Sequence, residues 1–513
     1  MHQAPPERTG ARREQHPWPA LGWTTLYVLA AGALQRSIPY PWDNDTAYHA
    51  AVGRLMREHG LLHAFPWTPF SLLSDRYADK ELLFHLLFVP VAGLDWVVAS
   101  QIIGTLAGAA LLSSLYFVLR REGVRYAGLW ALAPLLSSVI FIYRFVLVRP
   151  HLLSIALALV FLWAAVRGRY IVLAALSALY PWVYVAFWQL PCLLLIAAET
   201  ARFLSEGRAS WKPAAIAAAG ITAGVAVHPD TANLLAVNWI HMADVLFRNS
   251  WMGQQGFDLG AELEPLPVAA WAGGLGASVL MTVFAAWGAW KARRTDIVLM
   301  AFSLASLGFC VLTARSGRFV EYFVPFSVAA AALASRLIAW RFFSPAVIGA
   351  SAVLTLGMGA GFFAGLTQRP NEMPADVASY LRQQIPEGAQ IFTPDWDHTG
   401  WLLLTLPDRR FMVALDPTLF YRKDPERYRL WYRICHEAQP DAADAIRRYF
   451  GARYVLGLHI AQNNELFYQL SRDPGVKKML YSDSWLLFDL GQTARPEEPH
   501  GQLPSSAGTP IQR

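Results

Sequence analysis

The stretch around which this chain is organised is Pro41-Trp42-Asp43-Asn44-Asp45-Thr46-Ala47-Tyr48-His49, which follows the first long apolar run. Carboxylates held beside membrane-embedded segments are costly, so they are functional candidates by default. Two acids two residues apart can point into one cleft, where one acts as a general base or both hold a divalent cation such as Mg²⁺ or Mn²⁺. Asp43 and Asp45 are therefore candidate catalytic and metal-binding residues.

The same stretch also has a purely structural interpretation. Asp45 begins a helical pattern and suits the N-terminal cap of that helix. Capping explains one acid, but it does not explain Trp42, Asp43 and His49 beside it. Further along the loop, Glu81 precedes an apolar helix. The helix dipole favours an acid at that place, so a structural role explains Glu81 as well as a catalytic role does. We keep His49 as a candidate for substrate binding and Glu81 as a candidate for catalysis.

The composition indicates a polytopic α-helical membrane protein. Of the 513 residues, 55% are hydrophobic and only 16% are charged, whereas soluble domains carry about 25% charged residues. The chain has 20 tryptophans, which are typical where rings lie at the level of lipid headgroups. The net charge of +6 does not indicate nucleic-acid binding, because much of the basic excess falls in short loops between apolar runs. The lipid bilayer is the expected surrounding.

A segment that crosses a bilayer needs roughly 20 apolar residues. We predict about eleven spans, near 18–38, 97–119, 126–146, 151–166, 170–185, 187–204, 213–228, 265–290, 297–314, 319–339 and 345–366. The shorter apolar segment 82–93 is interpreted as an interfacial or re-entrant helix. The basic clusters within 8–13, 120–125, 167–169, 208–212, 291–294 and 336–341 then all fall on one side, which the positive-inside rule makes cytoplasmic. In a plasma (inner) membrane, the N-terminus is expected inside and the loops 39–96 and 229–264 outside.

The composition changes near Thr367, where charge and proline rise and no run is long enough to span. Alternating patterns then predict an α/β domain, with helices near 373–384, 426–437, 442–450 and 463–471 and strands near 390–392, 410–415, 454–457, 477–481 and 485–490. The expected organisation is a cytoplasmic segment 1–17, a transmembrane domain 18–366, an extracytoplasmic α/β domain 367–490 and a disordered tail 491–513.

Three arginines on the predicted outer side, Arg149, Arg315 and Arg318, go against the positive-inside trend. The planar guanidinium suits a phosphate, so we take them as candidates for binding a lipid phosphate. The alternative is anchoring of headgroups by snorkelling side chains. Glu262, just before a predicted span, is either a catalytic acid or a solvated loop residue.

The segment Asp395-Trp396-Asp397-His398-Thr399-Gly400 follows a predicted strand. An aromatic ring flanked by acids at a strand end can bind an acceptor substrate, so Trp396 and Asp397 are candidates for that role. The alternative is a loop that packs the Trp396 ring onto its own domain.

Several short motifs occur in the order found in one enzyme superfamily. They are Asp45-Thr46-Ala47-Tyr48-His49 with Gly53, Pro69-Phe70-Ser71, Glu81-Leu82, His228-Pro229, Ala261-Glu262-Leu263, Arg318-Phe319, Trp396-Asp397-His398-Thr399-Gly400 and Asp416. Together they resemble the GT-C superfamily of polyprenyl-phosphate-dependent glycosyltransferases, and within it a bacterial group distantly similar to the oligosaccharyltransferase catalytic subunit. The resemblance spans residues 39–418. The motif at 396–400 is similar to the Trp-Trp-Asp-Tyr-Gly acceptor motif, from which it departs at Asp395 and Thr399.

The resemblance implies transfer of a sugar from a polyprenyl phosphate or pyrophosphate to an acceptor, which is a protein, a glycan or another lipid. Asp45 or Asp43 would activate the acceptor, or position it with a metal, and Arg318 would neutralise the phosphate leaving group. The alternatives are a flippase of lipid-linked sugars and a non-catalytic envelope assembly protein. Transporters often show repeated halves and helices broken at the membrane midplane, whereas the polar candidates here gather at one face, which favours an enzyme.

Overall fold

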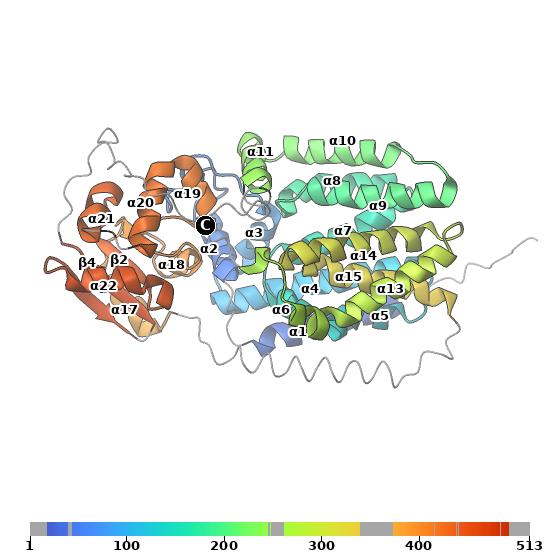
Figure 1. The fold of residues 1–513 in the computed structure, drawn as a ribbon, viewed down its shortest axis with the longest axis horizontal. Helices are drawn as coiled ribbons and strands as arrows, with labels where there is room; N and C mark the ends of the chain where they lie inside the picture. The colour runs from blue at the N-terminus through green and yellow to red at the C-terminus, as the bar shows by residue number, and fades with distance from the viewer. Residues whose placement is uncertain are drawn as a thin grey trace, which may run out of the picture.

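The computed structural model describes residues 18–38, 44–244, 247, 261–338, 373–414, 416–437, 439, 441–482 and 484–491. Asp43, the predicted span at 345–366 and the predicted tail beyond Gly491 lie outside these residues. The fold is mostly helical, with a small sheet near the C-terminus. Figure 1 shows the long helices side by side in a bundle and the later elements gathered at one end of it.

The helices before residue 338 follow the predicted apolar runs closely. They are α1 (Trp18–Ser37), α2 (Asn44–His59), α3 (Leu82–Phe88), α4 (Trp96–Arg121), α5 (Ala127–Ser137), α6 (Val139–Val146), α7 (His151–Val166), α8 (Tyr170–Val183), α9 (Gln189–Glu206), α10 (Lys212–Ala226), α11 (Thr231–Ile240), α12 (Val268–Ala270), α13 (Gly276–Lys291), α14 (Ile297–Arg315) and α15 (Val320–Ala334). A π-helical turn over Trp271–Leu275 joins α12 to α13.

Among the described residues, four helical stretches are long and apolar enough to cross a membrane, namely α4, 268–291, α14 and 317–337. The pair α5 and α6, bent by 97°, makes a possible fifth span. Other apolar helices, such as α7, α8 and α10, have 14 to 16 residues, which is shorter than the roughly 20 residues of a simple crossing. The structure therefore supports a membrane protein with at least four spans and does not confirm the predicted count of eleven.

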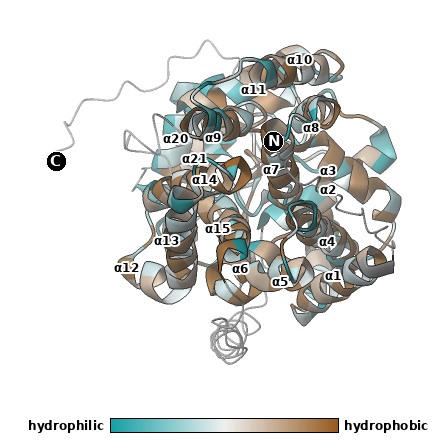
Figure 2. Cartoon of the chain, turned by 90° about the vertical axis from the view of Figure 1, so that its right-hand side faces the viewer, coloured by the Kyte–Doolittle hydropathy of each residue, from teal (hydrophilic) through white to brown (hydrophobic). Residues whose placement is uncertain are grey.

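The centre of the bundle is formed by α7 and α15. Every residue of α15 is buried, and so are most residues of α7. The run Ala329–Ala332 explains how α15 can be enclosed, because small side chains let neighbouring helix backbones approach closely. Figure 2 shows these two helices in the middle of the end-on view, surrounded by others with mainly hydrophobic residues.

One end of the bundle is held by Glu122, which follows α4. Its carboxylate accepts hydrogen bonds from Trp163 Nε1 at 2.8 Å and Arg167 Nε at 2.9 Å. Arg336 Nη1 donates to the Glu122 backbone carbonyl at 2.8 Å. Two basic residues, Arg167 and Arg336, therefore meet Glu122 at one end of the bundle, and all three come from loops that the charge pattern predicts on one side of the membrane.

The C-terminal part contains a four-stranded sheet in the order β1-β2-β4-β3. Its first two strands, β1 (Ile391–Phe392) and β2 (Tyr454–Leu458), pair in parallel, and β4 (Trp485–Asp489) pairs antiparallel with both β2 and β3 (Lys477–Tyr481). The predicted closing hairpin is confirmed. The accompanying helices are α17 (Ala375–Gln384), α18 (Thr399–Thr405), α19 (Pro417–Lys423), α20 (Pro425–His436), α21 (Ala442–Phe450) and α22 (Asn464–Arg472).

The strand predicted at 410–415 is wrong. Among its described residues, Arg410 forms a single parallel bridge with Gln390. The next backbone N–H, that of Phe411, donates instead to the carbonyl of Trp67 at 2.7 Å. The segment leaves the sheet because it is hydrogen-bonded to the first loop.

The C-terminal part is attached to the bundle through contact between α18 and α2 (Figure 1). Trp401 Nε1 donates to Asn44 Oδ1 at 2.8 Å, and Asn44 Nδ2 donates to Asp397 Oδ2 at 3.1 Å. Gly400 lies against the α2 backbone, so that a β-carbon there would be 2.5 Å from the backbone nitrogen of Tyr48. A side chain at position 400 would therefore push the two helices apart.

We predict that Gly400→Ala destabilises the protein by about 1–3 kcal/mol, the usual effect of overpacking a tight contact. Thermal unfolding of the purified protein measures this change. Gly308→Ala in α14 is the matched control, because a β-carbon there meets no atom within 4 Å. Equal unfolding temperatures for the two variants would contradict the close packing of α18 on α2.

Candidate functional site

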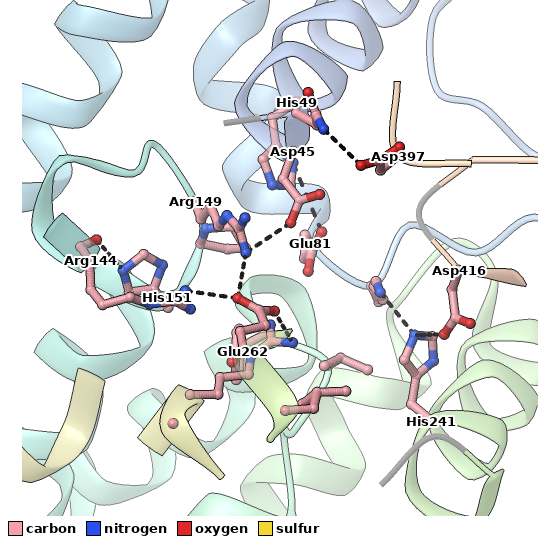
Figure 3. Close-up of a pocket in the computed structure, with 18 of the residues that line it drawn as sticks. Asp45, His49, Glu81, Arg144, Arg149, His151, His241, Glu262, Asp397 and Asp416 are labelled. Carbon is pink, nitrogen blue, oxygen red and sulfur yellow. Dashed lines mark hydrogen bonds and ion pairs between the residues drawn. The ribbon is translucent and has the colours of Figure 1, made fainter. Parts of the chain in front are cut away.

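A cavity of about 530 Å³ lies where the bundle meets the C-terminal part. Its walls come from segments far apart in the sequence, as Figure 3 shows. Its charged and polar lining comprises Asn44, Asp45, His49, Lys80, Glu81, Tyr143, Arg144, Arg149, His151, Tyr184, His241, Glu262, Arg318, Trp396, Asp397 and Asp416.

Helix α2 brings Asp45 and His49 to the cavity. They are four residues apart, so they lie on the same face of the helix. Asp45 occupies the first turn of α2, where the helix dipole favours a carboxylate. Its Oδ2 atom lies 3.0 Å from Nη1 of Arg149, in the loop between α6 and α7.

Glu262 is surrounded by arginines from three segments. Its Oε2 atom is 2.7 Å from Arg144 Nη1 and 3.1 Å from Arg149 Nη1. Its Oε1 atom is 3.2 Å from Arg318 Nη1. Burial alone would raise the pKa of the Glu262 carboxyl, but Arg318, Arg144 and Arg149 outweigh it and hold the pKa well below its usual range. Glu262 is therefore a carboxylate at neutral pH.

A second acid completes this cluster from inside the bundle. Glu321, 1% exposed in α15, accepts from Arg144 Nε at 2.7 Å and also pairs with Arg144 Nη2. The backbone carbonyl of Arg144 is 2.9 Å from His151 Nε2. Since a buried charge is costly unless it is paired, Glu321 fixes Arg144 at the base of the cavity.

His49 is the last of three buried side chains that contact one another in the order Asp79, His85, His49. His85 Nδ1 lies 2.6 Å from Asp79 Oδ2, and His49 Nδ1 lies 2.7 Å from His85 Nε2. The Asp79 carboxylate accepts the proton of His85 Nδ1, which leaves His85 Nε2 to accept the proton of His49 Nδ1. Burial, with His85 and Arg149 adding to it, lowers the pKa of His49 well below its usual range.

Lys80 and Asp416 approach one another across His241. Lys80 Nζ is 3.1 Å from His241 Nε2, and His241 Nε2 is 3.6 Å from Asp416 Oδ2. Burial lowers the pKa of His241 to about 3, and the positive charge of Lys80 contributes. Burial also raises the pKa of Asp416. A neutral His241 leaves the charge of Lys80 available to an anion in the cavity.

The predicted acceptor loop forms the opposite wall. Asp397 Oδ1 lies 2.9 Å from His398 Nδ1, and Asp395 Oδ2 lies 3.7 Å from it. Burial would lower the pKa of His398, but the two carboxylates outweigh it and raise the pKa to about 9. Trp396 and Asp397 line the cavity, whereas His398 supports them from behind as a cation.

Eight of the ten predicted site residues line this one cavity: Asp45, Glu81, Glu262, Arg318, Arg149, His49, Trp396 and Asp397. Asp416, from the motif comparison, lines it as well. Among the described residues, Arg315 is not part of the lining, and Asp43 lies outside those residues. Their roles stay predictions. Sequence reasoning missed Lys80, Arg144 and Glu321. The signal was present, because Lys80 is a basic residue on the outer side, and Arg144 and Glu321 are charges inside predicted spans.

In the part of the chain that the structure describes, two groups of side chains have the proximity needed for a metal ion, the first being His49, Glu81 and His85. The ring nitrogens of its histidines are 2.7 Å apart, a hydrogen-bond distance, and nitrogens that share a proton cannot both offer lone pairs to an ion. In the second group, Asp395, Asp397 and His398, the raised pKa keeps the imidazole protonated, and a protonated imidazole is not a ligand. Neither group fits a divalent cation in this state.

Comparison with solved structures shows which fold this is. ArnT from Cupriavidus metallidurans bound to undecaprenyl phosphate matches with a TM-score of 0.61 at 16% identity, over 93% of this chain and 100% of that one. The oligosaccharyltransferase AglB from Archaeoglobus fulgidus, in complex with an inhibitory peptide and a dolichol-phosphate, matches with 0.57 at 12% identity, over 86% and 70%. The mycobacterial arabinofuranosyltransferase AftD matches with 0.52 at 17% identity, over 92% and 42%.

All three proteins are GT-C glycosyltransferases. The chain therefore has the GT-C fold, which confirms at the level of the fold the resemblance drawn from the motifs. No protein-family model matches the sequence, and no curated protein matches it with significant similarity.

The raised pKa of His398 predicts a pH-dependent stability. The folded-state pKa of about 9 exceeds the ordinary value of 6.5, so the stabilisation is complete below about pH 6.5 and is lost as the pH rises through 9. We predict that His398→Gln removes at most about 3 kcal/mol of stability near pH 6 and much less above pH 9. Unfolding temperatures across this range measure the difference. His459→Gln, at an exposed histidine, is the control, and a difference independent of pH would contradict the assignment.

Proposed function

We propose that this protein is a membrane glycosyltransferase that moves a sugar from a polyprenyl-phosphate or -pyrophosphate donor to an acceptor on the extracytoplasmic face. One observation carries the proposal. Carboxylates, the basic residues Arg318 and Lys80, and the loop with Trp396 come from both parts of the chain and line one cavity. The GT-C fold supports it, since ArnT and AglB with that fold bind undecaprenyl phosphate and dolichol-phosphate.

The donor phosphate is bound by Arg318 and Lys80 in this proposal. The Arg318 side chain is 37% exposed, more than that of Arg149 or Arg144, so it can donate further hydrogen bonds. Lys80 Nζ lies 3.1 Å from Nε2 of the neutral His241. A guanidinium binds a phosphate through paired hydrogen bonds, and an ammonium acts as a point charge.

The acceptor hydroxyl is activated by Asp45. Its proton passes to the Asp45 carboxylate while the hydroxyl oxygen forms a bond to the anomeric carbon of the sugar. The bond from that carbon to the phosphate oxygen breaks, and its electron pair leaves with the phosphate, whose charge Arg318 and Lys80 stabilise. Attack opposite the leaving group inverts the anomeric carbon.

The acceptor enters beside Trp396 and Asp397. An indole ring covers the apolar face of a sugar or lipid, and the carboxylate accepts its hydroxyl protons. His49, with its proton fixed by His85 and Asp79, offers Nε2 as a hydrogen-bond acceptor within the same cavity. These groups match an acceptor that carries hydroxyls, whether it is a protein, a glycan or another lipid.

The proposed orientation places the cavity and the C-terminal α/β domain (367–490) outside the plasma (inner) membrane. Residues 18–366 then form the transmembrane domain, and residues 1–17 form a short cytoplasmic segment. The charge pattern supports this orientation, because the basic residues that meet at Glu122 follow α7 and α15 at the end of the bundle away from the C-terminal part (Figure 1).

We predict that Asp45→Asn reduces transfer by about 10²–10⁴-fold, the usual contribution of general base catalysis. Arg318→Ala and Lys80→Met should each raise KM for the lipid donor, because each removes a charged contact to the phosphate. The measurement is transfer of radiolabelled sugar from a polyprenyl-phosphate donor pool in membranes that contain equal amounts of each variant.

Arg208→Ala is the control for loss of an arginine, because its side chain is 82% exposed in a loop distant from the cavity. Transfer by Asp45→Asn at the wild-type rate would overturn the assignment of the base. Labelled lipid that changes leaflet without any transfer in the wild type would instead indicate a flippase.

The orientation is tested by labelling single cysteines after Cys192, Cys310 and Cys435 are replaced. We predict that a membrane-impermeant maleimide labels Asp408→Cys in intact cells and labels Arg208→Cys only after permeabilisation. Both side chains are well exposed, at 64% and 82%. The opposite pattern would place the cavity in the cytoplasm.

A further inference from the structure

One nitrogen atom of Arg149 lies between two carboxylates that the chain brings from opposite sides of the cavity. Arg149 Nη1 is 3.0 Å from Asp45 Oδ2 and 3.1 Å from Glu262 Oε2. Figure 3 shows the guanidinium between these acids, with a contact to each. We propose that Arg149 occupies the place of a divalent cation at this site, so that sugar transfer proceeds without a metal. The inference rests on the proposed glycosyltransferase function.

The two carboxylates need a cation between them. Asp45 comes from α2 and Glu262 from a turn more than two hundred residues later, and like charges that face each other repel. In many enzymes that act on phosphorylated donors, Mg²⁺ supplies this cation through carboxylate ligands at about 2.0–2.1 Å. Here the guanidinium of Arg149, which has several N–H donors, supplies the positive charge between the two carboxylates.

Three of the four carboxylate oxygens that could bind a metal between Asp45 and Glu262 contact arginines. Glu262 Oε2 contacts both Arg144 and Arg149, and Glu262 Oε1 contacts Arg318. Asp45 Oδ2 contacts Arg149. A divalent cation placed between Asp45 and Glu262 would have to displace Arg149, whose side chain is only 14% exposed and whose charge would then lose its partners.

The charges of this cluster also balance without a metal. Among the described residues, the three carboxylates of the cluster are matched by three guanidiniums, and the pairs are connected by the contacts given above. The members are Asp45, Glu262, Glu321, Arg144, Arg149 and Arg318. Adding a divalent cation would leave two uncompensated positive charges in a partly buried site, which is unfavourable.

The backbone around Arg149 holds the guanidinium in place. The Arg149 N–H donates to the Leu147 carbonyl at 3.0 Å, and Pro150 restricts the residue before it. His151, at the start of α7, lies within 2.9 Å of the Arg144 carbonyl. Arg149 is thus a positioning residue that orients Asp45 toward the acceptor, and binding of the donor phosphate is left to Arg318 and Lys80.

The experiment measures the metal dependence of transfer by the purified full-length protein in nanodiscs. Radiolabelled transfer from the polyprenyl-phosphate donor pool is followed in EDTA, and again after addition of Mg²⁺ or Mn²⁺. Binding of Mn²⁺ is measured separately by electron paramagnetic resonance. We expect the wild type to transfer at the same rate in EDTA and to bind no stoichiometric Mn²⁺.

The Arg149 variants test the role of the guanidinium. Arg149→Gln should lose about 100-fold in rate, as expected when a reacting group is mispositioned. Arg149→Lys, which keeps the charge, should recover part of that loss. Arg208→Gln is the matched control at a remote arginine, and unfolding temperatures establish that the variants are folded.

Two results would overturn the inference. One is wild-type transfer that stops in EDTA and returns with Mn²⁺. The other is one Mn²⁺ bound per chain whose signal disappears in Asp45→Asn. Either leaves the glycosyltransferase function standing. Absence of transfer by the wild type under every metal condition would instead refute the function itself, so the two failures are distinguishable. The Mn²⁺ measurement on the wild type decides the question even if Arg149→Gln does not fold.

Discussion

The site depends on the carboxylate of Glu262, which holds together three arginines from three separate segments. Arg144 ends a bent pair of helices, Arg149 lies in the loop after it, and Arg318 begins the most enclosed helix of the bundle. The mutual repulsion of three cations would open the cavity unless an acid lay among them. Glu262 is that acid, so the loop that carries it determines both the shape and the charge of the cavity.

The candidate site was largely predictable from residue types and their places along the chain. Asp45, Glu262 and Arg318 stand out because charge beside an apolar run requires a reason. Their pairing was not predictable, because distances between segments hundreds of residues apart depend on how helices pack. Arg144 and Glu321 were missed although a charge inside a predicted span is itself a signal. Only the helix packing shows that these two residues pair with each other.

The positions of the helices were predicted better than the number of membrane crossings. Helix positions follow the apolar runs, because burial among other helices and burial in lipid both require apolar residues. For that reason apolar runs predict helices better than they predict membrane crossings. Helix α7, for example, is apolar but has only 16 residues, fewer than a simple crossing needs. The strand predicted at 410–415 failed because Phe411 is hydrogen-bonded to the first loop, a partner that local pattern cannot reveal.

The contact of Asn44 with Asp397 joins positions that are 353 residues apart. At roughly 5–20 residues per second, a ribosome makes these two residues tens of seconds apart. During that interval α2 has already been made, but the wall that carries Trp396 and Asp397 does not yet exist. A chain released early would therefore carry the donor half of the proposed site without the acceptor half. The long sequence separation would restrict the proposed activity to completed molecules.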